Sequence, residues 1–427
     1  MRNLSGIVRV CFAFLFIILC SSCSIVTDDS DNHGIGDKNV KVLDNGMEEL
    51  PVIPYSNLAK KLSIRWPSAR YSDGNAILNV AVLAPFSGAN ASLGRSVIDA
   101  VKLALVAENN TLAKYIRVIP LDTGDDLGKL DEIFDQLDSY KIDVIIGPVF
   151  ANQARMLHSY LLGRNIPIFT LSNDISLSDK ENLYILGVIP SDQMNQLLKQ
   201  WWEVSNYSRY GMRRRKLTLH SILQDDRYGQ DLERGIKKSS ELYGYDSFVY
   251  RYNYGSENAL HELDKIMKDI AVSIKLNGQC KGDGMVGVFV PEGDWKVVKM
   301  YNYLENDVDL NGCTVFLGLD NWADDVQVGV GSSVFIERRY SRYFLDNFRT
   351  TYGYDASVLP ALAYDAMLIV FRTMEWNDYA KKWNLYDVTR PKGYEGVMGN
   401  VVLLASGASV RSCYFDDFLE KNNKKLV

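Results

Sequence analysis

From residue 79 onward, short runs of apolar residues alternate with segments in which apolar residues recur at helical spacing. The run at 79–86 has the uninterrupted character of a strand buried on both faces, whereas Val97, Val101 and Leu105 share one face of a helix. Further strand-like runs are IRVIPLD, DVIIGP, IPIFTLS, LYILGVI, LTLHSILQ, FVYRYNY, GMVGVFVPE and CTVFLGL. Strands of this kind alternating with helices predict an α/β fold with parallel sheets covered on both faces.

The pattern holds about ten such strands, which is too many for one tidy sheet and favours two doubly wound lobes. In such folds the loops after the carboxyl ends of the strands line the ligand crevice. The loops in question are residues 87–93, 122–126, 147–153, 171–175, 225–229, 291–295 and 319–324.

The start of the chain has the pattern of a secretion signal. Arg2 and Arg9 precede an apolar run at 10–19, which matches the core of a signal peptide and is too short to span a bilayer as a stable helix. Small residues then lead to Cys23, and this arrangement resembles a bacterial lipobox. The resemblance implies a signal peptide at 1–22 and diacylation of the Cys23 thiol. An ordinary signal peptide and an uncleaved anchor are the alternatives.

Two further features bear on the location of the chain. In lipoproteins of this kind an Asp after the acylated cysteine usually marks retention in the inner membrane, so Ser24 favours the outer membrane, on the periplasmic side. Residues 23–75 are mostly polar and acidic, and we expect them to form a flexible tether. We therefore expect a lipid anchor to be the only contact with the membrane.

Composition narrows the function classes. Hydrophobic residues make up 47% and charged residues 23% of the 427 residues, which is typical of a globular protein rather than a disordered or fibrous one. The formal net charge of −6 argues against nucleic acid as a partner, because nucleic acid requires a basic surface.

The motifs that could carry chemistry do not have the required context. GDGMVG at 282–287 precedes a strand instead of linking a strand to a helix, so it does not predict a dinucleotide site. Asp122-Thr-Gly lacks the second carboxylate of an aspartic protease. The four histidines form no zinc-binding pattern. We therefore expect no enzyme activity, no cofactor and no metal site.

Cysteine usage fits an oxidising compartment. If cleavage occurs before Cys23, the chain keeps Cys23, Cys280, Cys313 and Cys413, and acylation leaves three thiols. Three thiols cannot all pair. Cys280 and Cys313 flank one strand region and could form a disulfide.

Several segments together resemble the type 1 periplasmic binding fold, the class of the leucine-binding proteins. They are NVAVLAPFSGANASLGRSVIDAVKLAL, DVIIGPVFANQARML with NIPIFTLSND, DRYGQD at 226–231, LPALAYDAMLIVF at 359–371, and GYEGVMGN from Gly393. The resemblance covers roughly residues 77–420 in the right order. It implies two Rossmann-like lobes joined by three crossovers within residues 76–427. We expect lobe one to take 76–190 and 325–395, and lobe two to take 191–324 and 396–427.

Within that class the chain is similar to the lipoprotein activators of penicillin-binding proteins, on LAPFSGANASLG, IIGPVF, LGVIPSDQ and LGLDNW. This resemblance implies a non-enzymatic envelope lipoprotein that contacts a peptidoglycan synthase and stimulates it. The chain departs from the pattern in one respect, because a tether stands where the family's well-studied members carry a helical-repeat domain.

The alternative is a solute receptor of an ABC importer, with a small polar ligand such as an amino acid between the lobes. Receptors of this class hold the ligand carboxylate with two serines, but Phe150, Ala151 and Asn152 occupy the matching positions. Tyr228 matches a pocket tyrosine, and Asp320 lies where an acidic residue holds the ammonium group. The ligand candidates are Ser87, Phe150, Asn152, Ser172, Asn173, Tyr228, Glu292 and Asp320. Closure of the lobe interface by these polar residues is the preferred interpretation.

Overall fold

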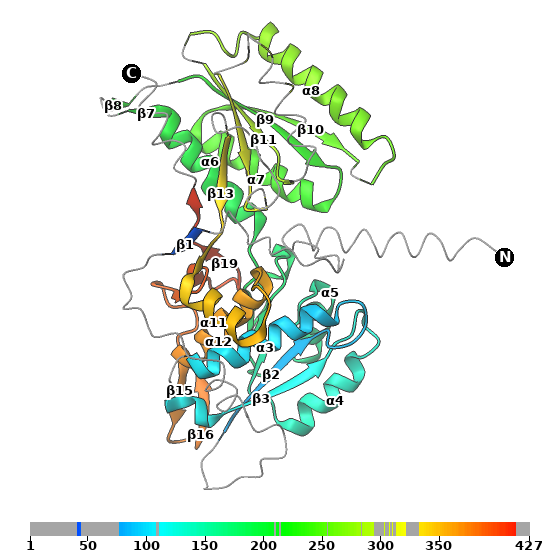
Figure 1. Cartoon of the computed structure of the whole chain (residues 1–427), viewed down its shortest axis with the longest axis vertical. Coiled ribbons are helices and arrows are strands. Elements are labelled where there is room, and N and C mark those ends of the chain that lie inside the picture. The colour runs from blue at the N-terminus through cyan, green and yellow to red at the C-terminus, as the bar shows by residue number, and fades with distance from the viewer. Residues whose placement is uncertain are drawn as a thin grey trace, which may run out of the picture. The chain divides into compact units, whose positions relative to one another are not determined.

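The computed structural model describes residues 41–43, 77–107, 111–208, 211–212, 215–253, 255–282, 284–293, 303, 307, 310, 313–321 and 333–415. These residues form two compact units (Figure 1). The described part of the five-stranded unit falls within Val42–Ile189 and Arg339–Ser412, and that of the six-stranded unit falls within Met1–Lys41, Pro190–Arg338 and Cys413–Val427. From residue 77 onward the chain passes between the units three times, and both central sheets are built on parallel strands. The predicted two-lobed α/β fold is confirmed.

The five-stranded unit has the strand order β3-β2-β4-β5-β6, with every pair parallel. Its strands are β2 (Leu78–Ala84), β3 (Ile116–Asp122), β4 (Val144–Ile146), β5 (Ile168–Thr170) and β6 (Leu183–Ile185). Its helices are α3 (Ala91–Ala107), α4 (Leu130–Tyr140), α5 (Ala151–Tyr160), α11 (Arg342–Tyr352) and α12 (Val358–Thr373), with short 3₁₀ turns at Thr111–Tyr115 (η1) and Ile175–Leu177 (η2).

Burial in this unit follows the sequence pattern. β2 is almost wholly buried, because Ala81 and Leu83 pack with the α4 and α5 side chains. α12 is buried along its length apart from Arg372, and it packs against α3. This explains why its sequence is apolar all round instead of amphipathic.

Three small sheets complete the five-stranded unit. A hairpin of β15 (Met374–Asn377) and β16 (Lys382–Leu385) follows α12, and β17 (Tyr394–Gly396), β18 (Gly399–Leu403) and β19 (Ser409–Arg411) form a three-stranded sheet. β1 (Lys41–Leu43) pairs with β14 (Arg339–Ser341). The carboxylate of Asp365 on α12 fastens the three-stranded sheet, because it accepts hydrogen bonds from Val397 N (2.7 Å) and Arg411 Nη1 (2.8 Å).

The six-stranded unit has the order β10-β9-β11-β12-β13-β20, parallel except for the last pair. Its strands are β9 (Leu217–Gln224), β10 (Asp246–Tyr252), β11 (Met285–Phe289), β12 (Thr314–Gly318), β13 (Ser333–Glu337) and β20 (Tyr414–Phe415), with a small hairpin of β7 (Tyr207–Ser208) and β8 (Gly211–Met212). Its helices are α6 (Pro190–Asn206), α7 (Arg227–Tyr243) and α8 (Ala259–Leu276).

The two faces of this sheet carry separate apolar clusters. Trp201 of α6 is buried with Leu232 of α7 and Phe289 on one face, and Ile270 of α8 packs with Phe316 on the other. A disulfide between Cys280 and Cys313 borders the second cluster, which settles a pairing that the sequence left open. Cys413 is not part of a disulfide among the described residues.

The unit boundaries differ from the expected ones at two places. Residues 333–338 belong to the six-stranded unit, because β13 extends that sheet beside β12. Residues 396–412 belong to the five-stranded unit, because β18 and β19 pair with β17 and Arg411 binds Asp365. The sequence pattern misplaced both segments.

The signal peptide at 1–22, Cys23 and nearly all of the tether lie outside the described residues. Within the described part of the chain, no helix is both long and apolar enough to cross a membrane.

Candidate functional site

Five of the predicted ligand residues lie at the carboxyl edge of the five-stranded sheet. Ser87 follows β2, Phe150 and Asn152 follow β4, and Ser172 and Asn173 follow β5. These three strands are neighbours in the order β2-β4-β5, so the sheet itself brings the five residues to one edge.

Ser87 is held by residues of its own unit. The Lys129 ammonium donates to Ser87 Oγ (2.7 Å) and pairs with the Asp122 carboxylate. Asp122 also accepts hydrogen bonds from the backbone N–H groups of Phe86 (2.8 Å) and Gly124 (3.0 Å). Burial alone would raise the pKa of Asp122, but these hydrogen bonds outweigh burial and hold the pKa well below its ordinary value.

A second carboxylate, that of Asp125 in the loop after β3, binds backbone amides of the loop between β2 and α3. It accepts hydrogen bonds from the N–H groups of Ala89 (2.7 Å) and Asn90 (3.1 Å). Gly88 directly precedes these two residues at a φ of +85°, and a Cβ there would approach the Asp125 carboxylate to 2.1 Å. The loop amides that could bind an anion therefore already bind carboxylates of the chain.

The positions that hold serines in amino-acid receptors lie at the start of α5. Phe150 is buried at the N-cap with an extended backbone and provides no side-chain hydrogen bond to the helix. Asn152 Oδ1 accepts from the backbone N–H of Gln153 (2.9 Å). Gln153 is fully buried and donates from Nε2 to the Asp126 carbonyl (2.9 Å), which ties the loop after β3 to this helix.

Ser172 is also engaged within the unit. Its hydroxyl accepts from Asp174 N (3.2 Å), its N–H donates to Thr170 Oγ1 (3.3 Å), and its side chain is buried. Asp174 pairs in turn with Arg155 of α5. Asn173 is half-buried beside this network.

The other three predicted residues lie at the carboxyl edge of the six-stranded sheet. Tyr228 is in the first turn of α7 after β9, Glu292 follows β11, and Asp320 follows β12. Burial raises the pKa of Tyr228 well above its ordinary value, and the charges of Glu292 and Asp320 add to this shift. The phenol therefore stays protonated beside two buried carboxylates.

Asp320 is paired with a cation of its own unit. Arg338, directly after β13, places Nε 3.0 Å from Asp320 Oδ2, and the two side chains are 9% and 8% exposed. Nearby, burial raises the pKa of the Cys413 thiol, and Asp192 and Asp320 add to this, so the thiol is neutral at physiological pH.

Sequence reasoning did not single out Arg338, Asp122, Asp125 or Lys129 as site residues. Asp122 and Asp125 do lie within the loop at 122–126 that was predicted to line the crevice, and this loop position could have pointed to them. Among the residues that the structure describes, no group of three or more His, Cys, Asp or Glu side chains could hold a metal ion.

Comparison with known proteins agrees with this architecture. Residues 78–273 match the model of a family described as periplasmic binding protein. An uncharacterized protein of Rickettsia prowazekii (strain Madrid E) is 26% identical over 170 residues, which cover 39% of this chain and 42% of that protein.

Solved structures of two functional kinds resemble the chain. The C-domain of LpoA from Haemophilus influenzae, described as a regulator of PBP1A, matches with a TM-score of 0.55 and 15% identity, covering 79% of this chain and 96% of that one. Full-length LpoA matches with a TM-score of 0.56 and 14% identity, covering 80% of this chain and 57% of that one. A putative branched-chain amino acid ABC transporter protein from Rhodospirillum rubrum matches with a TM-score of 0.62 and 13% identity, covering 79% and 96%.

These likenesses differ in how much of each protein they span. The chain spans less than half of the Rickettsia protein and just over half of full-length LpoA, but nearly all of the LpoA C-domain. At such identities the structural matches establish the fold. The protein has the type 1 periplasmic binding fold, which it shares with the LpoA C-domain and the Rhodospirillum rubrum protein, and residues 78–273 match the periplasmic binding protein family model.

Proposed function

We propose that this protein is a non-enzymatic lipoprotein of the bacterial envelope that regulates peptidoglycan synthesis by contacting a penicillin-binding protein. It is anchored through Cys23 on the periplasmic side, in the outer membrane rather than the inner one. It uses no cofactor, no metal and no nucleic acid.

The observation that carries the proposal is the pairing of Asp320 with Arg338. A receptor for amino acids must offer a buried carboxylate to the ligand's ammonium group and hydrogen-bond donors to its carboxylate, because unpaired buried charges cost several kcal/mol. Here Arg338 already neutralises Asp320, and Phe150 stands where a hydroxyl donor is needed. Both recognition groups of an amino-acid site are therefore altered.

The five-stranded unit supports the same conclusion. Ser87, Asn152 and Ser172 each make a hydrogen bond within the unit, and Asp122 and Asp125 take up the amides of the β2–α3 loop. A ligand would have to displace these bonds. Residues so engaged fit a rigid scaffold for protein contact better than a pocket that exchanges solutes.

The known regulator with the same fold indicates what kind of partner to expect. The LpoA C-domain is described as a regulator of PBP1A, and this chain spans 96% of it. By analogy, the partner is a peptidoglycan synthase of the same envelope.

A solute receptor for an ABC importer is the second candidate. Tyr228 beside Glu292 favours it, because a protonated phenol next to a buried carboxylate is a polar pair of the kind that binds cationic groups. The Rhodospirillum rubrum protein, which has the same fold, is described as a putative branched-chain amino acid ABC transporter.

A crosslinked pull-down separates the two candidates. The full chain, tagged at its C-terminus and expressed in its native envelope, is crosslinked and recovered, with an unrelated tagged lipoprotein as the control. We expect a penicillin-binding protein among the enriched partners. Enrichment of an ABC permease without any cell-wall synthase would overturn the proposal.

A further inference from the structure

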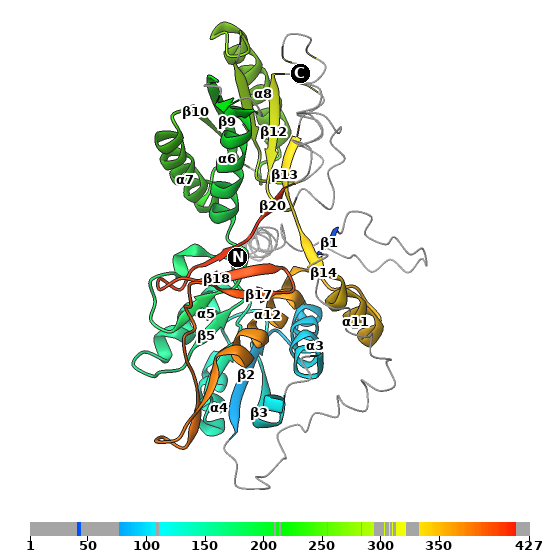
Figure 2. The same ribbon diagram turned by 90° about the vertical axis from the view of Figure 1, so that its left-hand side faces the viewer.

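The strand β10 forms one edge of the six-stranded sheet. It pairs with β9 over all seven of its residues, from Asp246 to Tyr252, in one continuous register. Figure 2 shows β10 on the outer side of β9, with β12 and β13 on the other side. Among the residues that the structure describes, no strand pairs with the outer side of β10. This side is therefore a complete edge to which another strand can be added.

The other edges of the two central sheets each carry a feature that discourages strand pairing. β20 has two residues and β6 has three, so both are short. β3 is as long as β10 but contains Pro120, which has no N–H to donate. β10 has the sequence DSFVYRY, without proline, glycine or lysine. Natural edge strands are protected by shortness, proline or lysine, so a strand that lacks all three is suited to pairing.

The backbone groups that point away from β9 belong to alternate residues of β10. The Tyr252 carbonyl accepts a hydrogen bond from the N–H of Asp225, directly after β9 (2.9 Å), so Tyr252 points toward β9. In a parallel ladder the N–H and C=O of one residue point to the same neighbour, and successive residues alternate. The outward residues are therefore Ser247, Val249 and Arg251. Within the described chain, no residue hydrogen-bonds their backbone N–H and C=O groups.

These outward residues are arranged symmetrically about Val249. When a second β10 lies antiparallel in the register centred there, Val249 faces its own copy, and Ser247 faces Arg251 of the second copy. These are the pairs that exchange backbone hydrogen bonds, so every outward group gains a partner. Phe248 then lies opposite Tyr250 of the second copy, in the pairs between, where the Cα atoms are about 4.5 Å apart.

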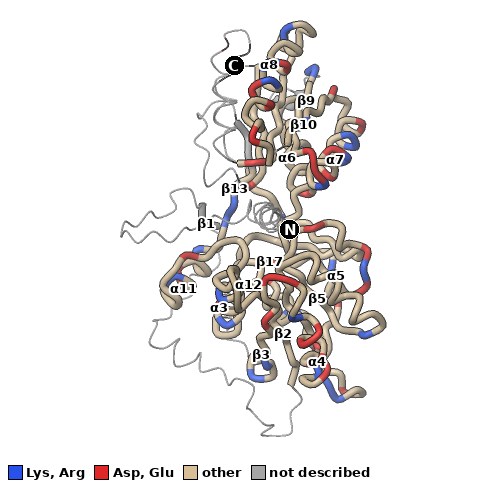
Figure 3. The backbone as a smooth tube through the Cα atoms, turned by 90° about the vertical axis from the view of Figure 1, so that its right-hand side faces the viewer, with Lys and Arg blue, Asp and Glu red and all other residues tan. Residues whose placement is uncertain are grey.

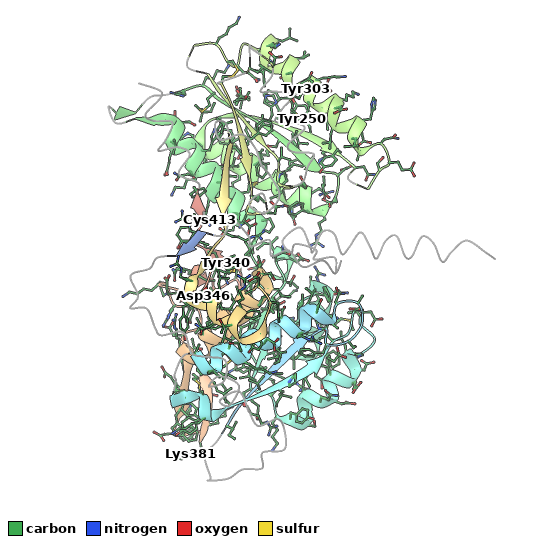
Figure 4. All side chains as sticks on the ribbon, viewed as in Figure 1. Tyr250, Tyr303, Tyr340, Asp346, Lys381 and Cys413 are labelled. Atoms are coloured by element: carbon green, nitrogen blue, oxygen red, sulfur yellow. A yellow bond between two sulfur atoms is a disulfide. The ribbon has the colours of Figure 1, made fainter. Side chains whose placement is uncertain are left out.

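The side chains on one face of β10 fit this register. Phe248 is 39% exposed although it stacks on His220, with 5.0 Å between the ring centroids. Tyr250 lies between the sheet and α8 (Figure 4), and its hydroxyl is 3.0 Å from His220 Nδ1. His220 thus holds both rings in place. Tyr250 of the second copy would cover the exposed part of Phe248, and such cross-strand aromatic pairs are favourable.

Charges do not oppose this pairing. Arg251 is the cation of β10, and its guanidinium forms an ion pair with Glu233 of α7. Figure 3 shows acidic and basic residues on both α7 and α8, the helices that flank β10. The flanking helices therefore present no surface of a single sign to a second copy.

We propose that the protein self-associates through β10, which pairs antiparallel with β10 of a second copy and joins the two six-stranded sheets into one. A two-fold dimer uses the same surface on both copies, and the register centred on Val249 meets this requirement. It pairs every outward backbone group and brings Phe248 against Tyr250, which a strand of unrelated sequence would not do. This association does not depend on the proposed regulation of a synthase, and its test contains no synthase.

Cysteine crosslinking of the full chain, purified from its own envelope and oxidised with a copper catalyst, tests the register. In Val249→Cys the two cysteines face each other, with Cα atoms about 5.5 Å apart, which suits a disulfide. In the matched control Ser247→Cys, the two cysteines are separated by four positions along the ladder, roughly 14 Å, which is too far. We expect a covalent dimer, reversed by reductant, from Val249→Cys, and none from Ser247→Cys or from the unaltered chain.

Analytical ultracentrifugation of the same full chain measures the affinity. Ser247→Lys places a lysine opposite Arg251 of the second copy twice in each dimer, so the dissociation constant of the dimer should rise about tenfold. Ser247→Glu is the control of opposite charge, and it should leave this constant unchanged or lower it.

Three results would each overturn the proposal: an unaltered chain that stays monomeric at every concentration tested, a dimer that Ser247→Lys does not weaken, or equal crosslinking of Ser247→Cys and Val249→Cys. A crosslink from Val249→Cys to a different protein, without the self-crosslink, would assign the edge to a strand of that protein and would also overturn it.

Discussion

Arg338 Nε lies 3.0 Å from Asp320 Oδ2 at the carboxyl edge of the six-stranded sheet, and both side chains are less than one-tenth exposed. Arg338 of the chain itself therefore pairs with Asp320, the acidic residue that the family resemblance predicts to hold the ammonium group of a ligand. Buried ion pairs of this kind are costly to break singly, because the remaining charge is left without a partner.

Arg338→Met should therefore destabilise the six-stranded unit by about 3–5 kcal/mol. The double variant Asp320→Asn/Arg338→Met should recover most of this loss, because it removes both charges. Urea unfolding, followed by hydrogen exchange at the β12 amides, measures both effects. If the single and the double variant lost the same free energy of unfolding, the two side chains would not stabilise each other and the prediction would be wrong.

The Cys280–Cys313 disulfide should stabilise the same unit. Its sequence separation of 33 residues predicts a loop-entropy contribution of about 4 kcal/mol. Cys280→Ala/Cys313→Ala should lower the urea midpoint, and reductant should reproduce the loss in the unaltered chain but not in the variant. Cys413→Ala serves as the thiol control. A reductant effect that persists in the double variant would contradict this assignment.

His220 should make the six-stranded unit sensitive to mild acid. It is buried between Tyr250 Oη (3.0 Å from Nδ1) and Gln279 Oε1 (2.9 Å from Nε2), and burial lowers its pKa from 6.5 although the Gln279 hydrogen bond raises it. The unfolded chain therefore binds the proton first, so the contribution of His220 is complete above about pH 6.5 and is lost as the pH falls.

The measurement is the melting temperature of the six-stranded unit between pH 7.5 and 5. His220→Gln should flatten its decline, whatever its effect on absolute stability. His158→Gln is the control. Burial also lowers the pKa of His158, but this residue lies in the five-stranded unit and should not affect the slope of the six-stranded one. An unchanged slope in His220→Gln would refute the assignment.

Asp122 should make the five-stranded unit sensitive to stronger acid. Its folded pKa lies below the ordinary 3.8, despite the opposing effect of burial, because of its hydrogen bonds with Lys129, Ser87 and two backbone amides. Its stabilisation is thus present above about pH 3.8 and is lost as the pH falls toward the folded pKa. Asp122→Asn should lower the stability of the five-stranded unit at pH 7 and make its loss of stability in acid shallower. Hydrogen exchange at the β2 amides measures both effects. The control Asp131→Asn, at an exposed position, should show neither effect.

The alternation of strand-like and helix-like segments predicted the fold because the burial of each element determines its local pattern of apolar residues. The apolar run of β2 is buried almost throughout, as its sequence pattern predicted. The sheets then bring Ser87, Phe150 and Ser172 to one edge, as strand order requires.

The pairings at that edge could not be predicted, because they depend on contacts between loops. Nothing in the sequence shows that Lys129 reaches back to Ser87, 42 residues earlier. Arg338 was hidden for a further reason. β13 is a short strand without a long apolar run, so the sequence pattern placed its segment in the wrong lobe, away from Asp320.

The central claim is that the recognition groups of an amino-acid site are altered by the chain's own residues, and calorimetric titration tests it most directly. The full chain is titrated with a panel of amino acids and muropeptides, alongside an authentic leucine-binding protein as the positive control. The account predicts no saturable heat from any amino acid. Stoichiometric binding of an amino acid at micromolar concentration would contradict it and would identify the protein as a solute receptor.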